Sequence, residues 1–218
     1  MMEQTKNDDV LKTGTTTIGI VCKEGVVLAA DKRTTMGHMI VNKQSEKIIP
    51  LNDDVAVTTA GNVSDNQLLV KLLKAEIKLK EMRTTRKLSV KEMANMGSGM
   101  LYNNIRKMST IPGISHFVLG GKDQDGFHLY DLFVDGSLTQ IEDYVSSGSG
   151  SVFALGVLET MYEKDMAVDK AVALAVKAVN AALQRDTASG QGIDVVTITN
   201  EGVKKHMQQM LETNLKSQ

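Results

Sequence analysis

The sequence offers little from which a disulfide framework, a metal centre or a membrane anchor could be built. It has one cysteine, Cys22, four scattered histidines and no tryptophan. A lone thiol has no disulfide partner, and dispersed histidines do not assemble a zinc site. No apolar run reaches the roughly 18 residues that a membrane-spanning helix needs. We therefore expect a cytoplasmic protein in a reducing compartment, with no cofactor, no metal and no membrane contact.

The chain also has no excess of charge of either sign, since 25 basic and 26 acidic residues leave a net charge of -1. This balance gives no electrostatic reason to bind nucleic acid. The first 14 residues have no apolar core and do not form a secretory signal. With 42% hydrophobic residues, the 218-residue chain can bury the core of one large domain.

Apolar periodicity divides the chain into strands, two helices, strands, two helices and a last strand. The helices are expected at about 64–83, 89–108, 152–164 and 169–185. The strands are expected in TTTIGIVCK, VVLAADKRT, EKIIPL, VAVTTAG, SHFVLGGK, FHLYDLFVD, SLTQIEDYV and IDVVTITN. Ser64 with Gln67, and Ser89 with Glu92, have the spacing of helix capping boxes. The tail from about Val203 is expected to be helical.

The order of these elements predicts an α+β fold. Helices come in pairs, and turn signals such as Asp125-Gly126 and Asp135-Gly136 join neighbouring strands as hairpins. A doubly wound parallel sheet would instead alternate strands and helices singly. Antiparallel sheets covered by helix pairs fit better. The SSGSGS segment, Ser146–Ser151, is expected to be a tight strand-to-helix loop whose amides and hydroxyls face a site.

Common catalytic patterns are missing, but Gly14-Thr15 raises a specific possibility. No histidine lies near a candidate nucleophile, and no Walker loop is present. A bond cut after Gly14 would make Thr15 the chain's first residue, with its own α-amine as base. A nearby lysine would lower the pKa of that amine, and a carboxylate would make the buried lysine tolerable. Asp31 and Lys47 occupy suitable strand ends, although such residues are commonly just solvated.

A glycine near the end of the VAVTTAG strand is a candidate oxyanion donor. Gly61 would let a substrate backbone come close, and its N–H could receive a developing negative charge. A glycine that simply ends a strand before a helix explains the same letters equally well.

Six segments in order make the chain resemble the archaeal type of 20S proteasome β subunit. The resemblance extends from Gly14 to about Thr199 and rests on TG before TTTIGI, AADKRTT, EKI, TTAGNVSDNQ, SSGSGS before VFALGVLE, and QRDTASG before IDVVTIT. It implies an N-terminal nucleophile hydrolase fold, a four-layer αββα sandwich. Residues 1–14 would be a propeptide removed by self-cleavage of Gly14-Thr15, leaving residues 15–218 as one catalytic domain.

The resemblance also implies a role for each matching residue. Thr15 would be the nucleophile of a threonine endopeptidase, with Asp31 and Lys47 as its charged partners and Gly61 as the oxyanion donor. The other implied positions are the polar surround of the nucleophile, Ser149, Asp186 and Ser189, and the peptide-binding residues Thr35, Thr59 and Val63. Some archaeal members have Glu where this chain has Asp31, which shortens the reach to Lys47 but keeps the charge. A pocket bordered by Thr59, Val63 and Ile49 would favour cleavage after apolar residues.

The implied partners are proteasome α subunits and other β subunits in stacked seven-membered rings. An unfolding ATPase ring would deliver unfolded polypeptides through the α ring. Three alternatives remain: an amidohydrolase of the same fold acting on a small molecule, a non-catalytic ring subunit that keeps its leader, and a compact bacterial homologue. The last would be a shorter chain and fits poorly.

Overall fold

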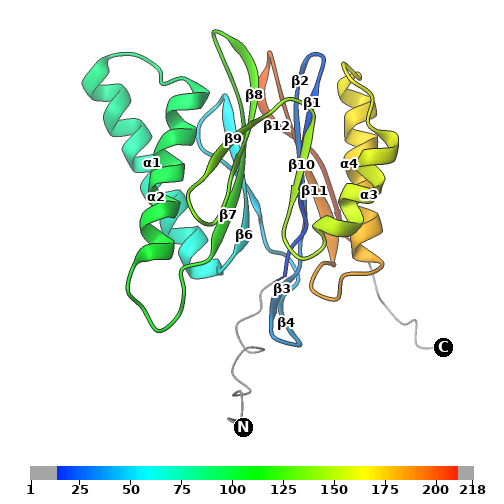
Figure 1. Cartoon of the computed structure of the whole chain (residues 1–218). Helices are drawn as coiled ribbons and strands as arrows, with labels where there is room; N and C mark the ends of the chain where they lie inside the picture. Colours follow the sequence, from blue (N-terminus) through cyan, green and yellow to red (C-terminus); the bar gives the residue numbers. More distant parts are fainter. Residues whose placement is uncertain (1–13, 211–218) are drawn as a thin grey trace, which may run out of the picture.

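Two antiparallel sheets face each other between two pairs of helices in the computed structural model, which describes residues 14–210 (Figure 1). One sheet has the strand order β10-β1-β2-β11-β12, and the other has the order β5-β6-β7-β8-β9. Every strand pairing within the two sheets is antiparallel. The four layers confirm the predicted α+β sandwich.

The first sheet comprises β1 (Thr17–Cys22), β2 (Gly25–Asp31), β10 (Tyr144–Ser147), β11 (Gly192–Thr199) and β12 (Gly202–Met210). The second comprises β5 (Ile48–Pro50), β6 (Val55–Gly61), β7 (Ser115–Asp123), β8 (Gly126–Leu132) and β9 (Leu138–Ile141). Residues such as Val26, Leu28 and Val118 fill the space between the sheets. Both faces of the central strands are thus buried, which explains their nearly continuous apolar sequences.

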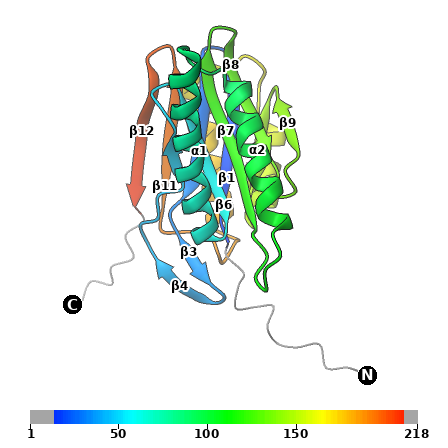
Figure 2. The ribbon, with the colours of Figure 1, turned by 90° about the vertical axis from the view of Figure 1, so that its left-hand side faces the viewer.

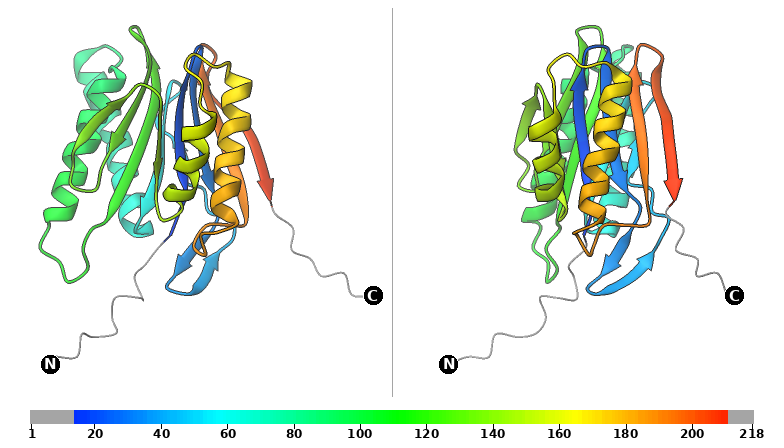
Figure 3. Two further views of the ribbon diagram at one scale, coloured as in Figure 1. Left: turned by 45° about the vertical axis from the view of Figure 1, so that its right-hand side comes forward. Right: turned by 90° about the vertical axis from the view of Figure 1, so that its right-hand side faces the viewer.

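Helices α1 (Val63–Thr84) and α2 (Val90–Arg106) cover the second sheet, as Figure 2 shows from that side. Helices α3 (Ser151–Met161) and α4 (Val168–Leu183) cover the first sheet on the other side (Figure 3). Alanines of α4, including Ala171, Ala175 and Ala178, are fully buried against β1, β2 and β11. Small side chains there let the helix approach the sheet closely.

The start of α2 confirms one predicted cap and the start of α1 corrects the other. Ser89 accepts a hydrogen bond from the Glu92 amide, and the Glu92 carboxylate accepts one from the Ser89 amide. Ser64, in contrast, already lies inside α1, whose N-cap residue is Asn62. Asn62 adopts the extended backbone of an N-cap and its amide side chain contacts Asp65, so Ser64 has no capping role.

The chain after Gly202 is a strand, not the predicted helix. Gly202, at φ +83°, reverses the chain, and β12 then pairs along the whole of β11. Lysine, glutamine and methionine favour a helix locally, but pairing here satisfies the edge of β11, which would otherwise expose its backbone groups. The part of the predicted tail beyond Met210 lies outside the described residues.

Two further differences concern strands. The predicted strand SLTQIEDYV is divided between β9 and β10, which belong to different sheets, because the chain crosses from one sheet to the other at residues 142–143. A short hairpin of β3 (Thr34–Met36) and β4 (Met39–Asn42) was not predicted. It projects beyond the two sheets at the end where β2 stops (Figure 1).

Candidate active site

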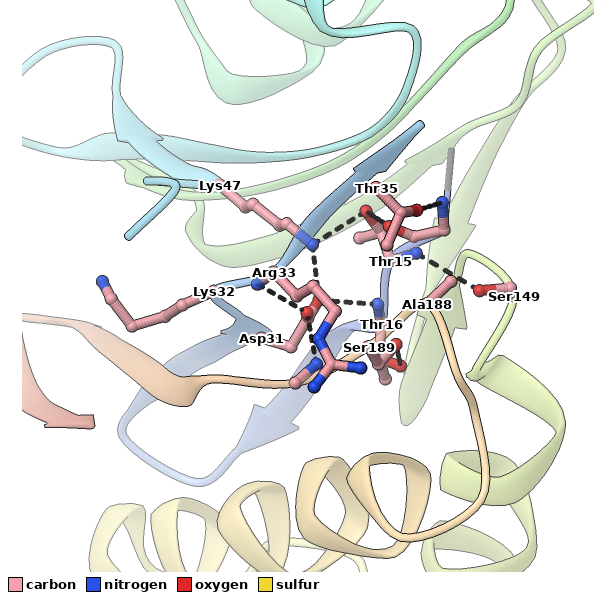
Figure 4. A network of polar contacts seen from close by, with 12 residues as sticks. Thr15, Thr16, Asp31, Lys32, Arg33, Thr35, Lys47, Ser149, Ala188 and Ser189 are labelled. Atoms are coloured by element: carbon pink, nitrogen blue, oxygen red, sulfur yellow. Dashed lines mark hydrogen bonds and ion pairs between the residues drawn. The ribbon is translucent and has the colours of Figure 1, made fainter. Parts of the chain in front are cut away.

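Thr15 lies just before β1, where the ends of both sheets come together (Figure 4). Its residue is only 6% exposed. Its Oγ1 donates a hydrogen bond of 2.7 Å to the carbonyl oxygen of Gly14, and it accepts one of 2.9 Å from Nζ of Lys47. The hydroxyl of Thr15 is therefore held between the carbonyl of the preceding residue and an amine.

Asp31, at the end of β2, anchors Lys47 and the backbone around it. Oδ1 of Asp31 lies 2.6 Å from Nζ of Lys47 and also accepts the N–H of Thr16 at 2.9 Å. Oδ2 accepts the N–H groups of Arg33 and Gly190, at 3.0 and 2.9 Å. Four hydrogen bonds to one buried carboxylate fix its orientation, and with it the direction in which Lys47 points.

Burial lowers the pKa of Lys47 below the 10.5 of a free lysine, because removal from water disfavours the charged ammonium. The carboxylate of Asp31 acts in the opposite direction but does not outweigh the desolvation. Lys47 is thus better able than a surface lysine to give up its proton near the hydroxyl of Thr15.

A second polar network holds the nitrogen of Thr15. The Thr15 N–H donates to Oγ of Ser149 at 3.3 Å, and Ser149 donates in turn to Oδ2 of Asp186 at 2.6 Å. Ser189 donates to the same carboxylate oxygen at 2.6 Å. Because the Ser189 proton points to Asp186, the hydroxyl of Thr16 is the donor in its 2.7 Å contact with Ser189.

The SSGSGS segment joins β10 to α3 through the predicted tight loop, which is residues 148–150, and the two glycines of this loop pack against Thr15. Gly148 has φ +92°, and a Cβ there would lie 2.0 Å from the carbonyl oxygen of Thr15. The N–H of Gly150 donates to that same oxygen at 3.3 Å. The loop thereby fixes both the backbone of Thr15 and the nearby hydroxyl of Ser149.

A small cavity of about 70 Å³ opens beside Thr15. Its lining includes the predicted pocket residues Ile49, Thr59 and Val63 together with Gly61. Gly61 has φ +105°, and a Cβ there would lie 2.3 Å from the carbonyl oxygen of Ile114. Residues with a side chain rarely adopt this backbone conformation, so position 61 favours glycine.

The cavity also has an acidic member that the sequence interpretation missed. Glu46 lines the cavity next to Lys47, and its carboxylate lies 3.3 Å from Nζ of the exposed Lys205. Glu46 directly precedes Lys47 in the EKI segment, and this neighbourhood was the signal that could have placed it at the cavity.

Thr35 and Thr59 take positions that bear on the site. Oγ1 of the buried Thr35 accepts the N–H of Gly14 at 3.3 Å. The N–H of Thr59 donates to the carbonyl oxygen of Lys47 at 2.9 Å, which ties β6 to the segment that carries the amine. The structure thus brings all eleven predicted site residues, Gly14 included, to one end of the sandwich.

Besides Glu46, the sequence interpretation missed Thr16, Arg33 and Gly190. Nη1 of Arg33 donates to the carbonyl oxygen of Thr187 at 2.7 Å and so holds the loop between α4 and β11. A Cβ on Gly190 would lie 2.3 Å from the guanidinium carbon of Arg33, so a side chain there would displace the guanidinium from its present position. A second basic residue directly after Asp31-Lys32 was the available signal for Arg33.

A second cavity, of about 510 Å³, lies away from this site. It sits at the opposite end of β6 and β7, where Asp54, Lys87 and Lys122 form surface ion pairs. Within residues 14–210 no cluster of side chains suited to a metal ion occurs. No helix in that range is long and apolar enough to span a bilayer.

The chain belongs to the proteasome family, since the family model described as "Proteasome subunit" matches residues 11–198. Its relatives include the proteasome subunit beta of Methanopyrus kandleri, 46% identical over 90% of this chain and 92% of that protein. The proteasome subunit beta of Ferroglobus placidus is 45% identical over 89% of this chain and 90% of that protein. That of Methanothermobacter thermautotrophicus is 42% identical over 89% and 90%.

Proposed function

We propose that this chain is the catalytic β subunit of a 20S proteasome core and acts as a threonine endopeptidase in the cytoplasm. The single observation that carries the proposal is the placement of the Thr15 hydroxyl, 2.7 Å from the Gly14 carbonyl oxygen and 2.9 Å from Nζ of Lys47. A nucleophile, a proton acceptor and the bond to be cut are together. The names of the relatives, proteasome subunit beta, support the same assignment.

Activation is self-cleavage of the bond between Gly14 and Thr15, which removes residues 1–14 and leaves residues 15–218 as the catalytic chain. Oγ1 of Thr15 attacks the carbonyl carbon of Gly14 while neutral Lys47 accepts the hydroxyl proton. The C–N bond breaks, the nitrogen of Thr15 takes a proton, and the Gly14 acyl group becomes an ester on Oγ1. Water then hydrolyses the ester, which gives a Gly14 carboxylate and restores the Thr15 hydroxyl.

Turnover uses the amine that activation has freed. An α-amine has a pKa of about 7.7–8.0, so it can accept the hydroxyl proton, through a water molecule, near neutral pH. Oγ1 attacks a peptide bond of the substrate, the N–H of Gly61 stabilises the tetrahedral oxyanion, and an acyl-enzyme forms and is hydrolysed. Ser149, Asp186 and Ser189 hold the amine, through the contacts already seen at the Thr15 nitrogen.

Substrates are unfolded polypeptides, whose backbone pairs with the chain around Thr35 and Val63. Ile49 and Val63 line the cavity beside Thr15 together with Thr59, and the two apolar side chains favour cleavage after apolar residues. The chain assembles with proteasome α subunits and further β subunits in stacked seven-membered rings. An unfolding ATPase ring acts through the α ring.

The two rival functions make different predictions for the same site. A small-molecule amidohydrolase would hydrolyse small amides and leave peptides intact. A non-catalytic ring subunit would retain residues 1–14. The buried Lys47–Asp31 pair in contact with the Thr15 hydroxyl favours the endopeptidase over a ring subunit, because a purely structural role needs no such contact.

The test is to coexpress the full chain with an α subunit and to measure the intact mass of the β chain and peptide cleavage. We expect wild-type chains to begin at Thr15 and Thr15→Ala chains to keep the leader and cleave nothing. Thr15→Ser, which retains a hydroxyl, is the matched control and should be processed and active. Leader removal or peptide cleavage by assembled Thr15→Ala particles would refute the proposal.

A further inference from the structure

Gly14, the residue before Thr15, lies in a space that is too narrow for a side chain. A Cβ on Gly14 would lie 1.8 Å from Cβ of Ala188 and 2.8 Å from Oγ of Ser149. The contact with the Ser149 oxygen is only slightly too short, whereas a contact of 1.8 Å with the Ala188 Cβ requires a large shift. The alanine Cβ is fixed to the backbone and cannot rotate away. Ala188 is therefore the contact that excludes larger residues.

Hydrogen bonds keep Gly14 in place against Ala188 and Ser149, which we call the Ala188–Ser149 wall. Its N–H donates to Oγ1 of Thr35 at 3.3 Å, and its carbonyl oxygen accepts the Thr15 hydroxyl at 2.7 Å. A residue that moved away from Ala188 would lose the contacts that orient the carbonyl toward Thr15. The cost would fall on the self-cleavage step, since it depends on that orientation.

The wall itself is held in place. The N–H of Ala188 donates to Oδ1 of Asp186 at 3.1 Å, and the carbonyl oxygen of Thr187 accepts Nη1 of Arg33 at 2.7 Å. Both bonds involve backbone atoms of the loop, so they survive a change in the side chain of residue 188. Figure 4 shows Ala188 between Ser149 and the Thr16–Ser189 contact.

The cavity beside Thr15 does not include Ala188. Ile49, Thr59 and Val63 line that cavity, and they come from β5, β6 and the start of α1. Ala188 comes from the loop between α4 and β11. A Cβ on Gly14 thus points to the Ala188–Ser149 wall and not to the wall built by β5 and β6.

We propose that Ala188 is a specificity-determining residue that restricts self-cleavage to glycine at position 14, while Ile49, Thr59 and Val63 select external substrates. The inference rests on the proposed function, and it separates two specificities of one nucleophile. The leader is accepted because its residue 14 has no side chain. Peptide substrates are selected by the side chain that they insert into the cavity beside Thr15.

The experiment uses the full chain coexpressed with an α subunit and follows leader removal by intact mass over time. Gly14→Ala should slow leader removal on the order of 10²-fold, as misplacement by about 1 Å does in positioned reactions. Gly14→Ala combined with Ala188→Gly should recover roughly tenfold or more of that loss. Ala188→Gly alone should process its leader and cleave peptides like the wild type.

Ala188→Ser is the matched control, because it keeps a Cβ and should not rescue Gly14→Ala. The pair Gly14→Ser with and without Ala188→Gly repeats the test if the alanine variant fails to assemble. Wild-type processing of Gly14→Ala, or a double variant no faster than Gly14→Ala, overturns the role of Ala188 alone. Leader removal from Thr15→Ala, measured in parallel, would instead overturn the proposed function.

Discussion

Two buried lysine–aspartate pairs lie back to back at the end of β2, and they are used differently. Asp31 is the last residue of β2 and Lys32 follows it directly, so their side chains point in opposite directions, as in an extended chain. Asp31 pairs with Lys47 at 2.6 Å beside Thr15, and Lys32 pairs with Asp194 at 2.6 Å on the other face. Figure 4 shows Lys32 pointing away from the network around Thr15.

The two pairs differ in how completely their hydrogen bonds are satisfied. Asp31 accepts four hydrogen bonds, and Lys47 has a second contact with the Thr15 hydroxyl. In the described residues, Oδ1 of Asp194 is buried with no hydrogen-bond partner. A buried ion pair alone is weak evidence of stability or function. The Asp31–Lys47 pair is distinguished by the hydrogen bonds that fix its orientation and by its contact with the Thr15 hydroxyl.

The largest expected effect comes from breaking the pair beside Thr15. Lys47→Met removes the proton acceptor and should slow leader removal about 10²–10⁴-fold, the usual contribution of a general base. Intact mass of the assembled β chain measures it. Lys47→Arg is the sharper control, because a guanidinium keeps the charge but does not release a proton. Processing of Lys47→Arg at the wild-type rate would contradict the assigned role.

Breaking the other pair should affect stability much more than catalysis. Lys32→Met leaves Asp194 buried without its cation and should lower the free energy of unfolding by about 3–5 kcal/mol. Lys32→Met with Asp194→Leu removes both charges and should recover most of this loss. Thermal unfolding and peptide turnover of assembled particles give the two readouts. A loss of turnover without a loss of stability would show that the pairs are not functionally distinct.

The smallest effect is a pH dependence that involves only the first pair. The unfolded chain binds the Lys47 proton more tightly than the folded chain, because burial lowers the folded pKa below 10.5. The neutral amine therefore becomes available at a lower pH than in a free lysine. Leader removal should speed up with rising pH, by at most about tenfold per pH unit, and level off above the lowered pKa. A rate that is flat or falls with pH would contradict proton transfer to Lys47.

Patterns in the sequence predicted most elements because burial imposes a period. The four helices lie within three residues of the predicted limits, since their apolar faces repeat at helical spacing. The division of SLTQIEDYV between two sheets could not be predicted, because both halves alternate alike and only the partner strands differ. The strand β12 was missed for a related reason, since its pairing with β11 overrides a local preference for helix.

The site residues were identified through motifs, while their supports were not. Thr15, Asp31 and Lys47 stand in distinctive segments. Thr16 and Arg33 contact the loop before β11, more than 150 residues away in sequence. Ala188 belongs to that loop and faces Gly14, so the identity of these three residues alone carries little signal.

The sequence by itself determined the residue types that carry the chemistry, the order of the elements and the glycine before Thr15, because these depend on local pattern and on covalent neighbours. Only the tertiary structure revealed the second buried pair, Lys32–Asp194, and the contact with Ala188 that requires this glycine. Both depend on distances between segments far apart in the chain, and those distances are set by how the two sheets and the loop before β11 pack together.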